Sequence, residues 1–311
     1  MTMEVAALLN KMVVFILLML IGYYLAKRGI VGKEFTRTAS KLVIDVFMVD
    51  TILSAILSSG GDVTLGNLKD IIILTFDMQI IGFVIAAFVS RFVSLPENQA
   101  PAYEILMGIG NSMFIALPIA GAIYGAYAVF IVSVSCIPFN VLLYSYGVWR
   151  LKGGGAGKSI HFRDMLSVPM ITTICGILLL VLNVPVPKAI SEFLTAIGGA
   201  TMPMSMLVIG SSLGTVSLLD AFRNRHLALL SAVRLLLIPA VTWLVCRLIT
   251  SDSVLLMTCM IIAASPSAVI VSVLAIQYGQ DGVLSSEAVQ HSTICSLVTI
   301  PLLIKIFSMF A

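Results

Sequence analysis

Two prolines stand in the middle of apolar stretches that are otherwise long enough to be helices: Pro118, in GNSMFIALPIAG, and Pro266, in AASPSAVIVSV. Proline lacks an amide donor and clashes with the preceding turn, so each helix is predicted to break near its proline. If the stretches cross a bilayer, the freed peptide groups need partners. The N-terminal end of a half-helix offers amides and a positive dipole end, which can hold an anion. An ordinary proline kink is the alternative for either proline alone.

Polar residues surround both prolines, although lipid tolerates neither irregular backbone nor exposed hydrogen-bonding groups. Their presence favours a functional break over a kink. Gly108 and Gly110 supply flexible backbone before Pro118. Asn140, beside Pro138 in the following apolar stretch, is a further polar residue worth testing. The candidate substrate-binding residues are Asn111, Ser112, Asn140, Ser265 and Ser267.

Three ionisable residues inside apolar stretches, Asp50, Asp77 and Arg234, are candidates for proton or ion coupling. A charge at membrane depth costs several kcal/mol unless it is paired, hydrated or neutralised. Asp77 and Arg234 are close enough in predicted depth for a salt bridge, which is the alternative to a role in transport. Asp50 lies near mid-depth with no obvious partner in its own helix. We therefore expect Asp50, or failing that Asp77, to take up and release a proton during transport.

The residue types favour neither an enzyme nor a channel. An enzyme would need a clustered nucleophile, a set of metal ligands or a pair of carboxylates at one depth, and none is found. Asp45 and Asp50 do not form such a pair, because they lie about 140° apart around their helix. The five cysteines are scattered singly, and His291 and Glu287 are expected at the membrane interface. No metal or other cofactor is predicted, apart from a coupling proton or sodium ion.

Composition places these residues in a membrane protein. Hydrophobic residues make up 59% of 311 positions and charged residues only 11%, against roughly 25% charged residues in soluble domains. The net charge of +3 comes from basic residues in short loops, which indicates topology and not nucleic-acid binding. About 20 apolar residues cross a bilayer. Ten transmembrane helices are predicted at roughly residues 8–26, 40–58, 69–90, 103–124, 127–149, 165–183, 189–213, 227–249, 254–276 and 288–310.

Loop charges predict the orientation, because basic residues collect on the cytoplasmic side. The larger set, placed in the cytoplasm, is Lys27, Arg28, Lys33, Arg37, Lys41, Arg91, Arg150, Lys152, Lys158, Arg163, Arg223 and Arg225. Both termini then lie outside the cytoplasm, in an inner or plasma membrane. The Gly-rich segment 150–164 is predicted to be a cytoplasmic linker. Residues 1–149 and 165–311 then form a five-plus-five inverted repeat, the usual plan of secondary transporters.

Four segments carry a family resemblance: GNSMFIALPIAGAIYG, PFNVLLYSYG, MPMSMLVIGSSLG, and the AASP and QYGQDG stretch followed by HSTICSLVTIPLLI. In their order and spacing, the chain resembles the auxin efflux carrier family of bacterial transporters, relatives of plant PIN-type carriers, over essentially its whole length. The resemblance implies a scaffold of helices 1, 2, 6 and 7 and a transport domain of helices 3–5 and 8–10. It also implies that helices 4 and 9 cross near Pro118 and Pro266. It places carboxylate recognition at Asn111, supported by Asn140.

One position departs from the family pattern, in which the second helix commonly has a proline after an apolar residue. Here Val49 stands in place of that proline, and Asp50 follows it. The energy coupling is therefore open. We expect a carrier of a small organic anion, such as a malate-, malonate- or auxin-like carboxylate, that works by alternating access. A sodium-coupled bile-acid-type symporter of similar architecture is the alternative. The substrate, the direction of transport and the oligomeric state, including a homodimer, stay open.

Overall fold

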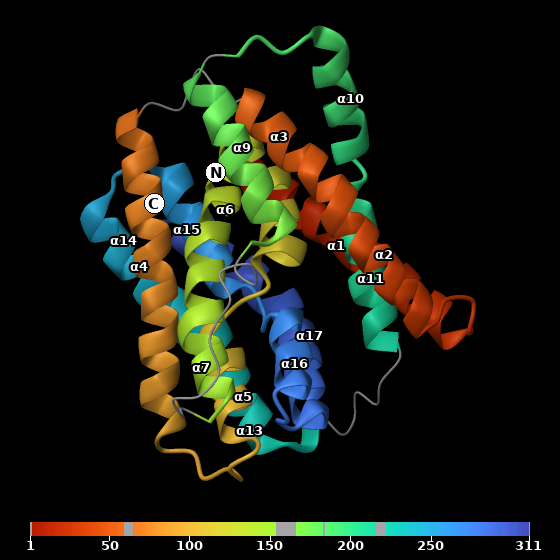
Figure 1. The fold of residues 1–311 in the computed structure, drawn as a ribbon, viewed down its shortest axis with the longest axis vertical. Coiled ribbons are helices and arrows are strands. Elements are labelled where there is room, and N and C mark those ends of the chain that lie inside the picture. Colours follow the sequence, from red (N-terminus) through yellow and green to blue (C-terminus); the bar gives the residue numbers. More distant parts are fainter. Residues whose placement is uncertain (1, 59–64, 154–165, 183, 215–221, 311) are drawn as a thin grey trace. The chain divides into compact units, whose positions relative to one another are not determined.

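A computed structural model describes residues 2–58, 65–153, 166–182, 184–214 and 222–310 of the chain (Figure 1). All elements within these residues are helical, and one isolated antiparallel backbone bridge joins two of the connections. The described chain divides into two compact units, each drawn from three separate segments. Unit 1 comprises residues 1–69, 113–136 and 167–216, and unit 2 comprises residues 70–112, 137–166 and 217–311.

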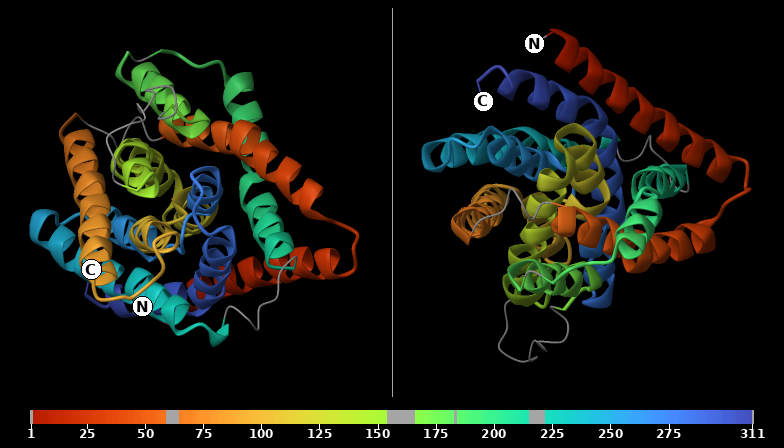
Figure 2. Two further views of the ribbon diagram at one scale, coloured as in Figure 1. Left: turned by 60° about the horizontal axis from the view of Figure 1, so that its bottom comes forward. Right: turned by 90° about the horizontal axis from the view of Figure 1, so that it is seen from above.

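Unit 1 is built around three pairs of packed helices. Its elements are α1 (Thr2–Lys27), α2 (Lys33–Leu42), the π-helical segment η1 (Val43–Phe47), α3 (Met48–Ser58), α9 (Val168–Val181), α10 (Lys188–Gly198) and α11 (Thr201–Gly214). The helix α11 packs along α1, and α9 and α10 both pack against α3 (Figure 2). Thr51 on α3 donates a hydrogen bond to the carbonyl of Gly198, at 2.9 Å, and so ties α10 to α3.

Glycines allow the close approach of α1 and α11. A Cβ atom on Gly210 would overlap the carbonyl of Met19, and one on Gly22 would overlap the carbonyl of Leu207. Small residues at such positions let two helix backbones meet, which is the common means of helix association in lipid. The paired glycines therefore determine that these two helices pack backbone to backbone.

Unit 2 holds most of the remaining helices. They are α4 (Leu65–Ser90, in unit 2 from Asp70), α5 (Ala100–Gly108), η3 (Leu143–Gly147), α7 (Val148–Leu151), α13 (Arg225–Ala232), η4 (Val233–Leu237), α14 (Ile238–Ile249), α15 (Ser253–Ala264), α16 (Val269–Gln277) and α17 (Gly282–Phe307). In α15 every side chain from Leu255 to Ala264 is buried, and in α5 every side chain from Pro101 to Gly108. Because nearly all their residues are buried, these two short helices form the centre of the unit.

The segment η2 (Ser112–Ala116) and the helix α6 (Leu117–Leu142) belong to both units. Residues 113–136 are part of unit 1, and Ser112 and residues 137–142 are part of unit 2. Within α6, Gly125 has φ 74° and ψ −156°, so the helix is broken there. Glycine adopts this conformation without the strain that a side chain would add. The break falls between the predicted helices 103–124 and 127–149.

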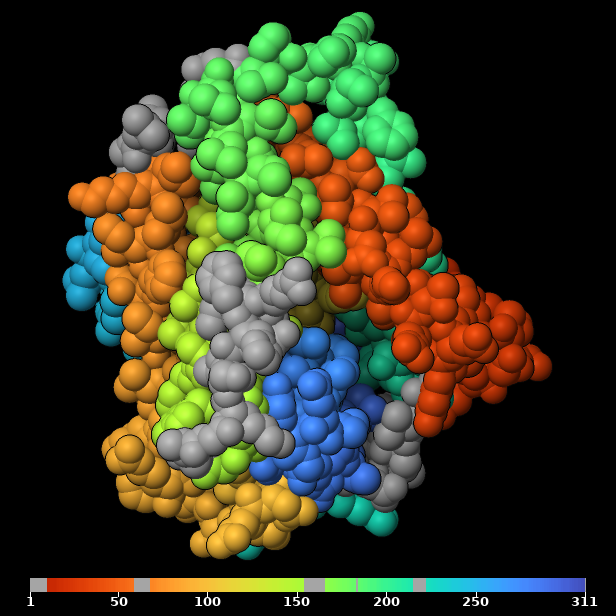
Figure 3. Space-filling model, in the orientation of Figure 1, coloured from red at the N-terminus to blue at the C-terminus, as the bar shows by residue number. Residues whose placement is uncertain are grey.

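Six helical stretches are long and apolar enough to cross a membrane: Asn10–Lys27, Leu68–Ser90, Ser112–Leu151, Lys188–Gly214, Arg225–Ile249 and Gly282–Phe307. The apolar helices Val168–Val181 and Ser253–Ala264 are shorter. The chain is thus an all-helical, multi-pass membrane protein in the part described, while the division into ten helices stays a prediction. Exposed apolar side chains such as Val84 and Phe88 on α4 suit contact with lipid. The helix α4 is drawn in orange in Figure 3.

Candidate functional site

Two helices of unit 2 end abruptly beside polar residues. The helix α5 ends at Gly108, and Ile109 is extended with φ −112° and ψ 129°. The helix α15 ends at Ala264, and Ser265 is extended with φ −66° and ψ 145°. Pro266 lies in the second connection, before α16 begins at Val269. Each helix end leaves backbone groups that need partners outside the helix.

The two interruptions supply partners for each other. Gly110 and Ser267 form the isolated antiparallel bridge. The amide of Asn111 donates to the carbonyl of Pro266 at 2.6 Å, and the amide of Ala268 donates to the carbonyl of Ile109 at 3.1 Å. Buried backbone groups are almost always paired, and this pairing explains how both helices can stop inside the unit. We call residues 109–111 and 265–268 the paired interruptions.

The sequence predicted a break near Pro118. The first interruption instead lies at residues 109–111, before that proline. Pro118 is helical and is the second residue of α6. The π-helical segment η2 directly precedes it, and such a widened turn is one way in which a helix accommodates a missing proline donor. At this interruption Gly110 allows Arg234 and Ser265 to approach the backbone, because a Cβ atom there would overlap the guanidinium group and the hydroxyl.

Arg234, on η4, binds both helix ends. Its side chain is buried, with 3% of its surface exposed. Nε donates to the carbonyl of Ser265 at 2.9 Å, Nη1 to that of Gly108 at 3.0 Å, and Nη2 to that of Ile262 at 3.4 Å. These carbonyls belong to the C-terminal ends of α5 and α15, so one guanidinium group caps two helices.

The alternative that Arg234 forms a salt bridge with Asp77 is wrong for the described chain, because the guanidinium donates to carbonyl groups and no ion pair joins these two residues. Asp77 is half-buried on α4. Asp50 is buried on α3 in unit 1, and no hydrogen bond or ion pair joins its carboxyl group to another described residue. Asp45 is exposed, and the proton-coupling role of Asp50 or Asp77 stays a prediction.

All five candidate substrate-binding residues lie in unit 2, and all are buried. The structure brings Asn111, Ser265 and Ser267 together at the paired interruptions, and Ser112 follows directly in the chain. The Ser265 hydroxyl donates to Ile262 at 2.6 Å. In the described chain the Ser267 hydroxyl and the Asn111 side chain have no hydrogen-bond partner. These two groups are therefore available to a ligand, whereas Asn140 is buried on α6 in the same unit.

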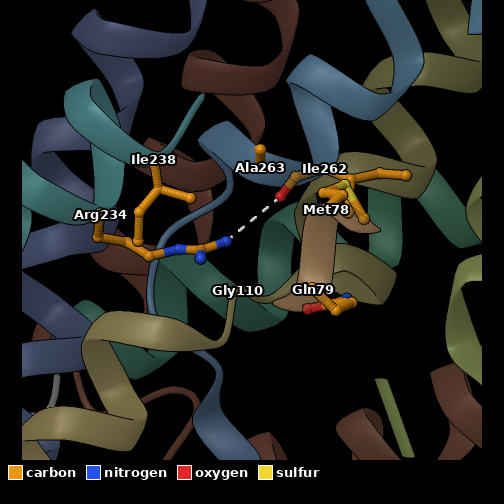
Figure 4. Close-up of a pocket in the computed structure, with 7 residues that line it drawn as sticks. All are labelled: Met78, Gln79, Gly110, Arg234, Ile238, Ile262 and Ala263. Atoms are coloured by element: carbon orange, nitrogen blue, oxygen red, sulfur yellow. Dashed lines mark hydrogen bonds between the residues drawn. The ribbon is translucent and has the colours of Figure 1, made fainter. Parts of the chain in front are cut away.

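A narrow pocket borders this arrangement (Figure 4). Figure 4 shows Arg234 pointing toward Ile262, with Gly110 beside the guanidinium group and Gln79 of α4 farther from it. The pocket is too tight to hold a water molecule as it stands. A ligand could enter only if the walls separated. Its lining residues are Met78, Gln79, Gly110, Arg234, Ile238, Ile262 and Ala263.

A buried charged cluster around Glu104 was missed from the sequence. Glu104 on α5 is only 3% exposed. It accepts hydrogen bonds from the Tyr146 hydroxyl at 2.5 Å, from Arg150 Nε at 3.0 Å and from the Ser90 hydroxyl at 3.2 Å. The available signal was a carboxylate at the start of one apolar stretch and an arginine at the end of the next. We call these four residues the Glu104 cluster.

His291 is buried among protein side chains, and its expected depth at the membrane interface stays a prediction. It is 4% exposed, and its Nδ1 lies 2.7 Å from the hydroxyl of Ser231 on α13. Its ring also packs against Phe222, with centroids 4.6 Å apart. The ring is thus held by a hydroxyl and an aromatic side chain. No group of three His, Cys, Asp or Glu residues arranged to hold a metal occurs in the residues that the structure describes.

Comparison with known proteins agrees with this architecture. A family model described as membrane transport protein matches residues 7–163 and 156–304. An uncharacterized transporter of Methanothermobacter thermautotrophicus is 26% identical over 291 residues, which cover 92% of this chain and 94% of the relative. An uncharacterized transporter of Methanocaldococcus jannaschii is 25% identical over 303 residues, which cover 94% and 97%. The chain therefore belongs to the membrane transport protein family, that of the auxin efflux carriers, and is a transporter and not an enzyme.

Proposed function

We propose that this chain is a secondary carrier of a small organic anion, such as a carboxylate, which it binds at the paired interruptions. We further propose that the chain crosses an inner or plasma membrane ten times, in two inverted repeats of five helices. Both termini then lie outside the cytoplasm. The main support for the carrier function is the bridge between Gly110 and Ser267, because two helices interrupted at one place inside a membrane protein are typical of substrate sites in secondary transporters.

The chemistry of the paired interruptions suits an anion. The amides of Val269 and Ile270, at the start of α16, have no backbone acceptor among the described residues. Unpaired amides and the positive dipole end at a helix N-terminus favour negative charge. The Asn111 side chain and the Ser267 hydroxyl can donate further hydrogen bonds to a carboxylate. Ser112, Asn140 and Ser265 complete the proposed site.

Alternating access is proposed as a movement of a transport domain relative to a scaffold, with residues 150–164 as a linker. The scaffold comprises the predicted helices 1, 2, 6 and 7, and the transport domain, which carries the site, comprises helices 3–5 and 8–10. Asp50 or Asp77 is proposed to exchange a proton during the cycle, since neither carboxyl group has an ion-pair partner among the described residues.

The test is thermal unfolding of the purified protein against a panel of organic acids, at two pH values, with and without sodium. An acid present at about ten times its Kd should stabilise the folded protein by about 1.4 kcal/mol and raise Tm by about 2–4 °C. The Asn111→Ala variant should lose this shift, while Asn10→Ala, the same change at an exposed position of α1, should keep it. A shift of equal size in Asn111→Ala would place the site elsewhere.

The coupling proposal is tested by transport into proteoliposomes at a series of pH values. The Asp50→Asn variant should change either the rate or its pH dependence, because an amide cannot exchange the proton. If neither changes, Asp50 has no coupling role, and Asp77→Asn is then the variant that decides between proton coupling and none.

A further inference from the structure

Arg234 is a buried cation whose charge is balanced in an unusual way. A guanidinium group at membrane depth costs several kcal/mol unless it is paired or hydrated. In the described chain no carboxylate forms an ion pair with it, and three backbone carbonyls accept its hydrogen bonds instead. The negative partners of Arg234 are therefore parts of the backbone.

The two helix ends together carry about one negative charge. The last carbonyls of a helix carry the negative end of its dipole, roughly half an elementary charge. Gly108 ends α5, while Ile262 and Ser265 lie at the end of α15. Two such ends in one place amount to about one negative charge, and a single guanidinium group provides one positive charge in return.

Half-helix C-terminal ends and unwound carbonyls are the groups that coordinate sodium in transporters with broken helices. A sodium ion needs several oxygen ligands, and here the guanidinium of Arg234 already occupies the oxygens that the two ends present. The absence of a side chain at Gly110 makes room for that guanidinium group, because a Cβ atom would overlap it. The place of a coupling cation is thus filled by the protein itself.

We propose that the Arg234 guanidinium is a fixed cation that takes the place of a coupling sodium ion at the paired interruptions, so that the anion is bound without sodium. The role of this cation in transport rests on the proposed carrier function. The fixed cation distinguishes the chain from the alternative of a sodium-coupled symporter, in which the same carbonyls would have to be vacant for the ion.

The first experiment uses the wild-type protein and needs no substrate. Tm is measured by intrinsic tryptophan fluorescence in sodium chloride and in choline chloride at equal ionic strength. We expect the two values to agree within the error of the measurement at every concentration. A rise in Tm that is specific to sodium and saturates with its concentration would overturn the fixed-cation proposal.

The second experiment removes the guanidinium. The Arg234→Ala variant should have a lower Tm, and millimolar guanidinium chloride should restore part of the loss in a saturable way, because the ion fills the vacated place. Wild type should not respond, and neither should Arg247→Ala, which removes an exposed arginine from α14. An Arg234→Ala protein as stable as wild type, or one that no cation stabilises, contradicts the proposal.

A third measurement separates this proposal from the carrier function. If Arg234→Ala does not fold, Arg234→Lys keeps the charge and should remain indifferent to sodium. The organic-acid shift of wild type is then measured in sodium-free buffer and should be as large as it is with sodium present. A shift that needs sodium overturns the fixed cation but leaves the carrier function standing. No shift with any acid, together with the expected cation results, overturns the carrier function alone.

Discussion

The Glu104 cluster allows a prediction whose size follows from the structure. Breaking the pair between Glu104 and Arg150 should destabilise unit 2, because the carboxylate is buried and accepts three hydrogen bonds. We consider Arg150→Met, which removes the cation, and Glu104→Gln, which removes the charge but keeps an acceptor for Tyr146.

The expected magnitude lies between the values for buried and exposed pairs. Removing one partner of a fully buried ion pair costs about 3–5 kcal/mol, whereas exposed pairs contribute about 0.2–1 kcal/mol. The side chain of Glu104 is 4% exposed, but that of Arg150 is 30% exposed, so water screens part of the interaction. We expect each single variant to lose about 2 kcal/mol and the pair to show a coupling free energy of about 1–2 kcal/mol.

The assay is a double-mutant cycle on the free energy of unfolding, measured by denaturant titration in mixed micelles. A matched control is the exposed pair Lys188 and Glu192, whose nitrogen and oxygen lie 3.6 Å apart with side chains 91% and 68% exposed. Its cycle should give a coupling of no more than about 0.5 kcal/mol. A Glu104–Arg150 coupling no larger than that of the control would refute the reasoning from burial.

Two further predictions concern the paired interruptions and the loop before α17. Gly110→Ala should lower the free energy of unfolding by about 1–3 kcal/mol, because the added Cβ atom overpacks against Arg234. In the control Gly32→Ala the Cβ atom meets open space, so the free energy of unfolding should change little. Equal effects in the two variants would contradict the proposed contact. The pKa of Asp281 is held below its ordinary value of 3.8, chiefly by the Leu284 amide and also by the side chain of Gln99. Its ionised form therefore stabilises the protein above about pH 4, and this contribution is lost as the pH falls through the lowered pKa. The Tm difference between wild type and Asp281→Asn should then shrink between pH 6 and pH 3, and a constant difference would contradict this assignment.

Composition and apolar runs were sufficient to predict an all-helical membrane protein, because burial in lipid requires long stretches without charge. They also indicated the helix boundary at Gly125, where glycine adopts a backbone conformation that other residues rarely adopt. Pro266 indicated the second interruption for the same local reason, since proline cannot continue the hydrogen bonding of a helix. Local chemistry was thus visible in the sequence.

The position of the first interruption was not predictable, because the groups that pair with it, at Pro266 and Arg234, lie far along the chain. Gly110 must lack a side chain since Arg234, on another helix, lies against it. The proline nearby misled the prediction, because η2 accommodates Pro118 within a helix. Glu104 escaped notice for a similar reason: its partners Tyr146 and Arg150 come from a different stretch, and only packing brings them together.

In the proposed transport cycle, the negative helix ends at the paired interruptions need a cation at every step, whereas the positive helix end of α16 needs an anion only while substrate is bound. This difference can be measured. The C-terminal ends of α5 and α15 are present whether or not an anion is bound, so their balancing cation must be permanent, as a covalently attached side chain is. Under the proposed function, the amides at the start of α16 bind an anion that must leave, so their partner cannot be a side chain of the protein. Removing Arg234 should therefore lower Tm without any ligand, whereas Asn111→Ala should change Tm only when an acid is present. Equal losses in the unliganded protein would show that both residues serve the fold alone.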